Sequence, residues 1–341
     1  MAAEPSPRVL WLTDRGERHQ RNALKAAPPS LEVIIKRRPT SQELNELLPT
    51  IEYLISERSE PVTAEMIRAA TKLKHIVRLG SLIHDIDVEA ARAASVRVSL
   101  QPVLVSCYAA EYVMMMILAL LRRLNRTMNA TLSTNHRFGA QRSDENQFFF
   151  NWLNYQDIGG LYGKTVAILG MGEIGVELAR RLKPFGLGGL YYYKRNRYPK
   201  AVEYDLWLRY GEFLQCVKQA DVIVSLLPYS EQNDRRIRSG TFAVMKSTAL
   251  LVHAGSGGVI DEQALVEALQ EKRLGGAALD TYEFEPLQPT HSLVKLARDP
   301  NSNLLLTPHI ASAFIPGDRS DDYGEIVRAV ERLPLKYEVS R

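Results

Sequence analysis

Three glycines stand close together in the middle of the chain, at a spacing that suits phosphate binding. Gly170, Gly172 and Gly175 directly follow the apolar run Thr165–Leu169, and a helical pattern continues over Ile174–Leu182. After a strand, the first glycine permits a tight turn, the second lets a pyrophosphate approach the backbone, and the third allows close packing of the helix. We therefore predict a dinucleotide-binding turn formed by Gly170, Met171, Gly172, Glu173, Ile174 and Gly175. The alternative is a glycine-rich turn without a ligand.

A basic sequence follows the next apolar run, Leu190–Tyr193. A domain that binds NAD usually has an acidic residue there, about 20 residues past the glycines, to accept a hydrogen bond from the ribose 2′-hydroxyl. This chain has Lys194, Arg195 and Arg197 instead. Cations cannot accept that bond but suit a 2′-phosphate, so we predict that the cofactor is NADP rather than NAD. A solvated basic loop without a nucleotide contact is the alternative.

Polar residues also follow three later apolar runs. The first sequence is a glycine-rich bend over residues 253–258, the second contains Asp280 and Glu285, and the third contains His309. The carboxyl ends of parallel strands meet at one edge of a sheet, which is where α/β proteins bind their ligands. These residues are therefore candidates for a single site.

Short apolar runs alternate with helical patterns in two series, which predicts parallel sheets with helices on both faces. The runs are Val9–Leu12, Leu31–Ile35, Tyr53–Ile55, Ile76–Arg78 and Val96–Val98 in the first series, and Thr165–Leu169, Val222–Leu226, Ala249–Val252, Ala277–Leu279 and Leu304–Leu306 in the second. Asp87 is placed to cap a helix over Val88–Ala94, and Asp261 to cap one over Glu262–Lys272.

A long helical pattern, Ala109–Met128, separates the two series and leads into a polar, aromatic-rich stretch, Thr131–Tyr162. We interpret this stretch as an arm that reaches a second subunit. The most apolar part of the helix, Tyr112–Leu121, is about half as long as the roughly 20 residues that span a bilayer. We therefore expect a buried helix and no membrane partner.

The composition is that of an ordinary globular protein: 341 residues, 45% hydrophobic and 24% charged, with a net charge of +4. This length predicts two domains, because a single core rarely grows past about 250–300 residues. The small net charge gives no reason to expect a nucleic-acid partner. The two cysteines, Cys107 and Cys216, lack the spacing of a disulfide framework or a metal site, and no signal peptide is evident, so we expect a cytoplasmic protein without a metal.

The order of the motifs resembles the D-isomer-specific 2-hydroxyacid dehydrogenase family. The matching sequences are the GMGEIG turn from Gly170, LLP at Leu226–Pro228, GGVIDEQALVEAL from Gly257, ALD followed by the EP pair at Glu285, and TPHIAS from Thr307. The resemblance implies a Rossmann dinucleotide-binding domain over residues 107–309, inserted into a smaller flavodoxin-like α/β substrate domain formed by residues 1–106 and 310–341. It also implies an active site in the cleft between the domains, and a homodimer.

The resemblance further implies roles for single residues. His309 and Glu285 match the family's proton-transfer pair, in which a carboxylate favours the imidazolium and orients the ring for donating a proton to a carbonyl. Asp280 matches the aspartate that hydrogen-bonds the nicotinamide carboxamide. Leu227, Pro228, His253, Ala254 and Gly255 are placed at the cofactor, and Ser81, Leu82 and Ile83 at the substrate.

This chain departs from the family pattern in the substrate half of the site. Ser256 occupies the catalytic position where the family has an arginine that binds the substrate carboxylate and polarises the carbonyl. Leu82 stands where a glycine is expected, and Tyr108 where a small hydroxyl residue is usual. Arg78, just before the substrate loop that begins at Gly80, is the nearest candidate by position to take the place of the missing arginine; the alternative is that it ends a strand on the surface.

These observations predict an NADP(H)-dependent oxidoreductase that transfers a hydride to the carbonyl of a small molecule other than a simple 2-keto acid. One alternative is an NADP(H)-binding sensor or interaction protein that has lost dehydrogenase turnover. Another is a lyase or epimerase that holds NADP(H) tightly, although nothing in the sequence favours it.

Overall fold

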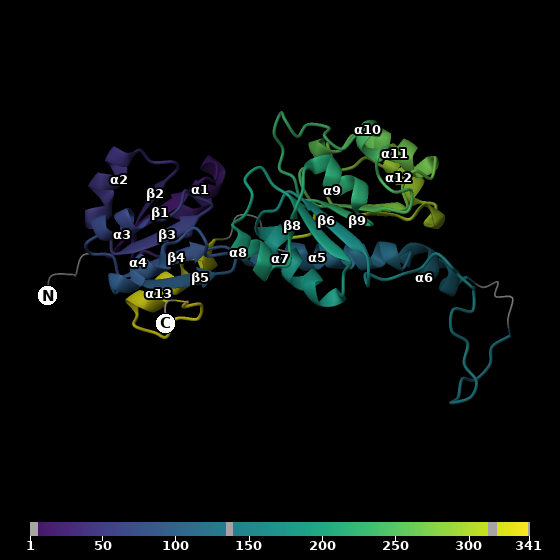
Figure 1. Cartoon of the computed structure of the whole chain (residues 1–341), viewed down its shortest axis with the longest axis horizontal. Coiled ribbons are helices and arrows are strands. Elements are labelled where there is room, and N and C mark those ends of the chain that lie inside the picture. The colour runs from purple at the N-terminus through teal and green to yellow at the C-terminus, as the bar shows by residue number, and fades with distance from the viewer. Residues whose placement is uncertain (1–5, 134–138, 313–318, 340–341) are drawn as a thin grey trace. The chain divides into compact units, whose positions relative to one another are not determined.

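The computed structural model describes residues 6–133, 139–312 and 319–339. The chain divides into two compact units: the first combines Met1–Cys107 with Phe314–Arg341, and the second is Tyr108–Ala313. The sequence analysis placed the two boundaries after residues 106 and 309, and the structure places them after residues 107 and 313. Each unit is a parallel sheet with helices on both faces, so the predicted α/β class is confirmed (Figure 1).

The first unit contains a five-stranded parallel sheet in the order β2-β1-β3-β4-β5, which is the flavodoxin-like order. Its strands are β1 (Arg8–Thr13), β2 (Glu32–Lys36), β3 (Tyr53–Glu57), β4 (His75–Leu79) and β5 (Arg97–Gln101). Its helices are α1 (Glu17–Lys25), α2 (Ser41–Leu47), α3 (Ala64–Ala69), α4 (Val88–Ala93) and, from the C-terminal segment, α13 (Gly324–Val330). Asp87 accepts a hydrogen bond from the amide of Ala90, so the predicted cap of α4 is confirmed.

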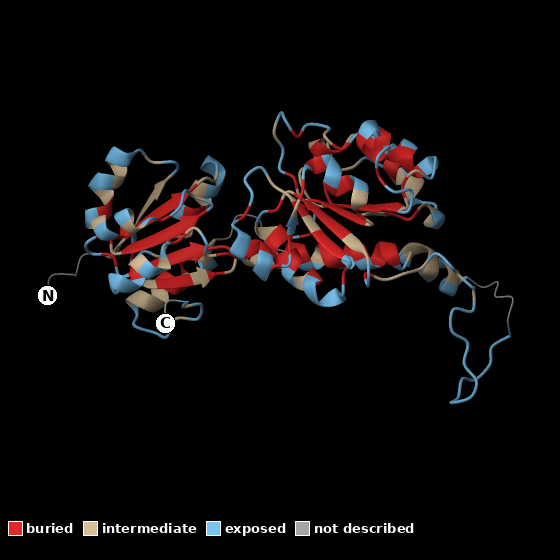
Figure 2. Ribbon diagram, viewed as in Figure 1, coloured by how far each residue is buried: buried red, intermediate tan, exposed pale blue. Residues whose placement is uncertain are grey.

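Strand β1 shows why the strands of this sheet are apolar without interruption. Successive side chains point to opposite faces, so Val9 and Trp11 enter one core cluster while Leu10 and Leu12 enter another. Both faces are covered by helices, and β1, β3 and β4 are buried along almost their whole length, whereas the edge strand β2 is only partly buried (Figure 2). The C-terminal segment completes one face, because the buried Tyr323 donates a hydrogen bond to the carbonyl of Ala23 at 2.7 Å.

The second unit contains a seven-stranded parallel sheet in the order β12-β11-β10-β9-β6-β7-β8. Its strands are β6 (Thr165–Leu169), β7 (Gly189–Tyr193), β8 (Arg209–Tyr210), β9 (Val222–Ser225), β10 (Leu250–His253), β11 (Gly276–Leu279) and β12 (Leu304–Leu306). Its helices are α5 (Leu104–Leu121, which begins in the first unit), α6 (Leu124–Leu132), α7 (Glu173–Leu182), α8 (Lys200–Asp205), α9 (Phe213–Gln219), α10 (Ser239–Phe242), α11 (Glu262–Gln270) and α12 (Ser292–Ala297). Strand β6 lies between β9 and β7, so the chain order reverses at β6, where Rossmann domains bind dinucleotides.

Two elements of the second unit differ from the sequence prediction. The helix expected over Ala109–Met128 is two helices, α5 and α6, because Arg123 adopts a left-handed conformation with φ 46°. Its side chain forms an ion pair with Asp157 at 2.6 Å. Strand β8 was not predicted, because two residues are too few to form an apolar run.

Helix α5 is long and apolar enough to cross a membrane, by length and composition only. More than half of it is buried inside the protein, and Val113, Met116 and Ile117 are completely buried. A core helix of a globular unit has these properties as well, and the buried helix that the sequence predicted is present.

Candidate active site

The glycine turn after β6 has the geometry that its three glycines predict. Gly170 has φ +94°, and a Cβ on it would lie 2.7 Å from backbone atoms of Leu226 and Leu227. A Cβ on Gly172 would meet nothing within 4 Å, which leaves open space beside the turn. A Cβ on Gly175 would lie 2.9 Å from Sδ of Met171, so this glycine allows α7 to pack closely. The tight turn at Gly170, the open space beside Gly172 and the close packing of α7 at Gly175 are therefore confirmed.

The N-terminus of α7 can hold the pyrophosphate of a dinucleotide. Gly172 is the N-cap of this helix, and no side chain caps it, so the amides of the first turn are not used by a capping group. The amides of a helix N-terminus and the positive end of the helix dipole favour an anion. The residues present therefore fit a nicotinamide dinucleotide, with its pyrophosphate at residues 170–175.

The loops after β9 and β10 lie against each other beside this turn. The amide of Leu226 donates to the carbonyl of Leu169 at 2.7 Å, which joins the β9 loop to the end of β6. A Cβ on Gly255 would lie 2.6 Å from the carbonyl oxygen of Leu227, so only glycine fits at this contact. The structure thus brings Leu227 and Gly255, two predicted cofactor positions, to the same edge of the sheet as the glycine turn.

His253, another predicted cofactor position, is fully buried at the end of β10. Burial lowers the pKa of His253 to about 4, so the ring is neutral at physiological pH. Its Nε2 lies 3.2 Å from the carbonyl oxygen of Ser256 and donates to it. His253 therefore holds the bend that carries Ala254, Gly255 and Ser256, and it supplies no positive charge.

The basic loop after β7 is tied to the glycine turn. Tyr198 donates a hydrogen bond from its hydroxyl to the carbonyl of Met171 at 3.1 Å, and the ammonium group of Lys194 lies 3.7 Å from the centre of the Tyr198 ring. Arg195 is exposed and forms no ion pair with any residue that the structure describes. The loop that carries Lys194 and Arg195 is therefore joined to the glycine turn, and the binding of a 2′-phosphate by these residues remains a prediction.

Arg197 has a different environment. Its Nε and Nη2 atoms lie 2.6 and 2.8 Å from the two carboxylate oxygens of Glu203, which is 6% exposed. Glu203 also accepts a hydrogen bond from the hydroxyl of Tyr192 at 2.8 Å. The hydrogen bonds from Arg197 lower the pKa of Glu203 to about 2. Glu203 offsets the charge of Arg197, so this residue supports NADP binding less strongly than the sequence alone indicated.

His309 and Glu285 are brought together as the motif match predicted. Nδ1 of His309 lies 2.8 Å from Oε2 of Glu285. The ionised carboxylate can only accept, so Nδ1–H donates and Nε2 is left for another partner. His309 has φ 54°, in the left-handed region, where non-glycine residues are uncommon and cluster at functional sites.

The second carboxylate oxygen of Glu285 also accepts a hydrogen bond. The amide of Tyr282 donates to Oε1 of Glu285 at 3.0 Å, and the hydroxyl of Tyr282 donates to the carbonyl of Thr307 at 2.9 Å. Burial raises the pKa of the Tyr282 hydroxyl, which remains a donor. Tyr282 therefore links the loop that carries Glu285 to the loop that carries His309. The sequence analysis did not single out Tyr282; its position between Asp280 and Glu285 was the available signal.

Asp280 is completely buried, and its carboxylate shapes the loop that carries His309. Oδ1 accepts the hydroxyl of Thr307 at 2.7 Å and the amide of Ile310 at 3.0 Å, and Oδ2 accepts the amide of Ala311 at 2.8 Å. These bonds hold the backbone on both sides of His309. The predicted contact of Asp280 with the nicotinamide carboxamide remains a prediction.

Ser256 lies between β10 and the short helix Gly257–Val259, with its amide donating to the carbonyl of Leu227 at 3.0 Å. It is partly exposed, and its backbone is extended, with φ −90° and ψ 133°. A Cβ on Gly257 would lie 1.8 Å from the carbonyl oxygen of Tyr282. Gly257, which follows Ser256, therefore packs directly against the loop that carries Glu285.

The predicted substrate loop follows β4 in the first unit. Ser81 and Leu82 are buried, and Ile83 packs against the core cluster on one face of the sheet. Arg78, the candidate replacement for the missing arginine, is 5% exposed, and its Nε lies 3.0 and 2.9 Å from the carboxylate oxygens of Asp85. Arg78 also donates to the carbonyl of Leu79. Its guanidinium group is therefore bound by Asp85 within its own unit.

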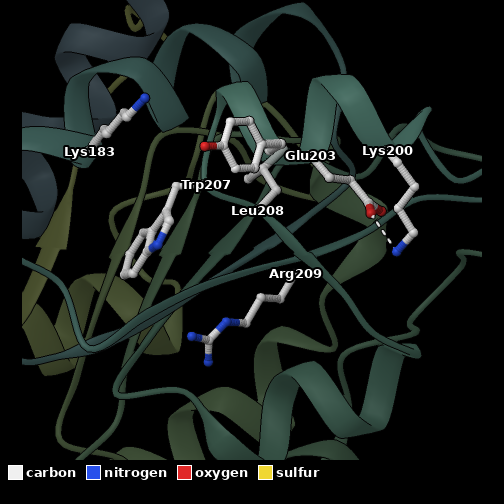
Figure 3. Close-up of a pocket in the computed structure, with 7 residues that line it drawn as sticks. Lys183, Lys200, Glu203, Trp207, Leu208 and Arg209 are labelled. Atoms are coloured by element: carbon white, nitrogen blue, oxygen red, sulfur yellow. Dashed lines mark ion pairs between the residues drawn. The ribbon is translucent and has the colours of Figure 1, made fainter.

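A cavity of about 650 Å³ lies elsewhere on the second unit, by α8 and β8 (Figure 3). Its lining residues are Lys183, Lys200, Glu203, Tyr204, Trp207, Leu208 and Arg209. None of them belongs to the glycine turn or to the loops after β9 and β10. This cavity is therefore separate from the predicted cofactor positions in those segments.

A strand, glycine turn and helix that fit a dinucleotide, together with a histidine–glutamate pair in the same unit, define a Rossmann-type oxidoreductase that uses a nicotinamide nucleotide. Residues 114–311 match the family model of the D-isomer specific 2-hydroxyacid dehydrogenase, NAD binding domain. The chain belongs to the D-isomer specific 2-hydroxyacid dehydrogenase family, as the motifs predicted.

Individual relatives agree with this assignment. The glyoxylate reductase of Korarchaeum cryptofilum (strain OPF8) is 31% identical over 288 residues, which cover 84% of this chain and 78% of that protein. The glyoxylate reductase of Thermococcus kodakarensis is 32% identical over 263 residues, which cover 77% of this chain and 74% of that protein. The crystal structure of the PH0520 protein from Pyrococcus horikoshii OT3 has 27% identity and a TM-score of 0.55, covering 98% of this chain and 95% of that one. The protein is an NAD(P)-dependent oxidoreductase of the class that acts on CH–OH groups.

Proposed function

We propose that this protein reduces the carbonyl group of a small molecule with NADPH, and that His309 donates the proton. The observation that carries the proposal is the 2.8 Å hydrogen bond between His309 and Glu285. When bound, a reduced nicotinamide would supply the hydride for the carbonyl carbon. The carbonyl oxygen then requires a proton, and Nε2 of a protonated His309 supplies it. The product is an alcohol, and the imidazole becomes neutral.

Glu285 orients the imidazole in this reaction. Its carboxylate accepts Nδ1–H, which fixes the ring so that Nε2 points away from the carboxylate. The negative charge of Glu285 also stabilises the positive charge on His309 before proton transfer. Because Tyr282 holds the second oxygen of Glu285, the carboxylate stays in one orientation.

The substrate that we propose is not a simple 2-keto acid. A 2-keto acid brings a carboxylate, and the family arginine that would bind it is replaced by Ser256. A serine hydroxyl forms one neutral hydrogen bond, about half as strong as a charge-assisted one. Glyoxylate, which the names of two relatives give as their substrate, is thus a poor candidate here. A bulkier or uncharged carbonyl compound suits a pocket with serine at this position.

The cofactor preference rests on Lys194 and Arg195. Each charge-assisted hydrogen bond to a 2′-phosphate contributes about 1.5–3 kcal/mol, and about 1.4 kcal/mol is a tenfold change in affinity. NADPH should therefore bind at least tenfold more tightly than NADH, and the double variant K194A/R195A should weaken this preference. Equal affinity of the wild-type protein for both cofactors would contradict it.

The decisive experiment measures binding and turnover separately. The full chain is titrated with NADPH and NADH, and the absorbance of the reduced nicotinamide is then followed with a panel of aldehydes, ketones and keto acids. Oxidation of NADPH by at least one carbonyl compound supports the proposal. Tight NADPH binding without turnover on any compound would support the alternative, a nucleotide-binding sensor.

We also propose that the protein is a homodimer. The segment after α5 exposes large apolar side chains that a second copy would cover. They are Leu132, Phe148, Phe149, Phe150 and Trp152, of which Phe150 is 80% exposed. Sedimentation equilibrium of the wild type and of F149S/F150S tests this, since the substitutions should weaken the dimer.

A further inference from the structure

Arg236 connects two segments that lie on opposite sides of the glycine turn. Its Nη2 donates to the hydroxyl of Tyr193 at 3.0 Å, and its Nη1 donates to the side-chain carbonyl of Asn233 at 2.9 Å. Asn233 in turn donates to the carbonyl of Pro228 at 2.9 Å. Tyr193 is the last residue of β7, and Pro228 belongs to the loop after β9. Arg236 therefore bridges the end of β7 and the β9 loop.

This bridge lies at the point of the sheet where the cofactor is expected. Strands β9 and β7 are the two neighbours of β6, which carries the glycine turn. The carbonyl of Tyr193 accepts the amides of Gly170 and Met171 at 3.0 and 3.3 Å. The hydroxyl of Tyr193 thus holds Arg236 while its backbone holds the turn. Lys194, the first residue of the basic loop, follows directly.

Two aromatic rings hold the guanidinium group in a defined position. Its central carbon lies 4.8 Å from the centre of the Tyr193 ring and 4.4 Å from that of Phe213. Guanidinium groups at these distances from aromatic rings are attracted by the ring quadrupole. Arg236 is therefore prearranged, and little side-chain freedom is lost when a ligand binds to it.

The positive charge of Arg236 is not offset by a carboxylate. No ion pair joins it to any residue that the structure describes, and its two side-chain acceptors, Tyr193 and Asn233, are neutral. A guanidinium has five N–H donors, so three remain after these two bonds. A partly buried cation with spare donors favours an anionic ligand.

We propose that Arg236 is a specificity-determining residue that binds the 2′-phosphate of NADPH together with Lys194 and Arg195. This inference rests on the proposed use of NADPH. A 2′-phosphate carries about −1.5 to −2 charges at neutral pH, whereas the 2′-hydroxyl of NADH carries none. Arg236 thus supplies the third cation that the sequence assigned to Arg197, whose charge Glu203 offsets.

The test uses two ligands that differ only in the 2′-phosphate: adenosine 2′,5′-bisphosphate and adenosine 5′-monophosphate. Their affinities for the full chain are measured by calorimetry, without any turnover. The variants are Arg236→Gln, which removes the charge, and Arg236→Lys, which keeps it. Arg238→Gln is the matched control, because Arg238 is exposed and forms no ion pair with a described residue.

We expect Arg236→Gln to weaken binding of the bisphosphate at least tenfold, which corresponds to about 1.4 kcal/mol, and to change binding of the monophosphate less than about threefold, since only the charged group is lost. Arg236→Lys should bind the bisphosphate with intermediate affinity, because a lysine keeps the charge but not the geometry. Arg238→Gln should bind both ligands like the wild type.

Other outcomes would overturn the inference and separate it from the proposed function. An equal loss for both ligands would show that Arg236 only supports the adenosine pocket, and no loss would show that it does not reach the ligand. In either case a wild-type preference for the bisphosphate would leave NADPH as the cofactor, bound through Lys194 and Arg195. A wild type without this preference would refute both the cofactor choice and the role of Arg236.

Discussion

Nδ1 of His309 lies 2.8 Å from Oε2 of Glu285, although the two residues are 24 positions apart in the chain. The loops after β11 and β12, two neighbouring strands, carry them, so the order of the sheet sets their separation. Tyr282 and Asp280 then fix the backbone around both residues. The pair therefore has a fixed geometry before any substrate binds, as a proton donor requires.

Replacing the proton donor should abolish most of the activity and leave cofactor binding intact. His309→Gln should lower kcat by roughly 10²–10⁴-fold, the usual contribution of a general acid. The affinity for NADPH should change little, since His309 lies outside the glycine turn and the basic loop. Stopped-flow turnover with the best substrate of the carbonyl panel and a fluorescence titration with NADPH measure the two effects.

His291 offers a matched control for this prediction. Its Nε2 lies 3.2 Å from Glu262 in the same unit, so it forms a second histidine–glutamate pair outside the proposed site. His291→Gln should retain the wild-type kcat. Full turnover by His309→Gln would remove His309 from the mechanism.

Asp280→Asn should destabilise the protein and reduce turnover. One carboxylate oxygen would be replaced by an amide NH₂ that faces a backbone N–H or the Thr307 hydroxyl, so a buried donor loses its acceptor. We expect a loss of about 1–3 kcal/mol in the free energy of unfolding. Urea unfolding followed by circular dichroism measures it. An Asp280→Asn variant as stable as the wild type would show that the carboxylate does not hold this loop.

Ser256→Arg should create activity towards 2-keto acids. The extended backbone at Ser256 accepts any side chain, and an arginine there can bind a carboxylate bidentately and stabilise the developing charge on the carbonyl oxygen. The gain in kcat/KM for pyruvate or glyoxylate should be at least about 10²-fold, in line with one oxyanion donor. Ser256→Lys should gain less, because lysine lacks the bidentate geometry. Efficient reduction of these acids by the wild type would refute the argument.

The first unit should lose stability as the pH falls below about 6.5. Burial lowers the pKa of His75 from 6.5 to about 4, and its Nε2 donates to the hydroxyl of Ser99, which donates to Glu325. Between these two values the unfolded chain binds a proton that the folded one does not, so the free energy of unfolding falls with decreasing pH. The contribution of the neutral His75 to the free energy of unfolding is fully present above pH 6.5, the pKa of this residue in the unfolded chain, and is lost as the pH drops towards 4.

For His75 alone the expected loss between pH 7 and pH 5 is roughly 2 kcal/mol. Urea unfolding followed by the fluorescence of Trp11, which is buried in the same unit, reports on this part of the chain. His75→Gln should show a smaller difference between the two pH values than the wild type. Identical pH dependence of the two proteins would exclude His75 as the cause.

The sequence alone was sufficient for the class of fold, the glycine turn and the histidine–glutamate pair. The fold class and the glycine turn depend on local patterns, namely apolar strands and glycines at fixed spacing, whereas the histidine–glutamate pair followed from the resemblance of its motifs to the family. The caps at Asp87 and Asp261 were predictable for the same reason, because a cap and its helix are contiguous. The break in the helix at Arg123 was not, since its ion pair with Asp157 joins distant segments.

Only the tertiary structure decided which cations are available to a ligand. Nothing in the sequence distinguishes Arg78, Arg197 and Arg236. In the structure, Asp85 forms an ion pair with Arg78 and Glu203 forms one with Arg197. Arg236 instead packs against two aromatic rings and forms no ion pair with a described residue. The partner of a long side chain depends on which strands are neighbours. Because β9 and β7 flank β6, Arg236 from the β9 loop meets Tyr193 at the end of β7, a contact that no local pattern of residues specifies.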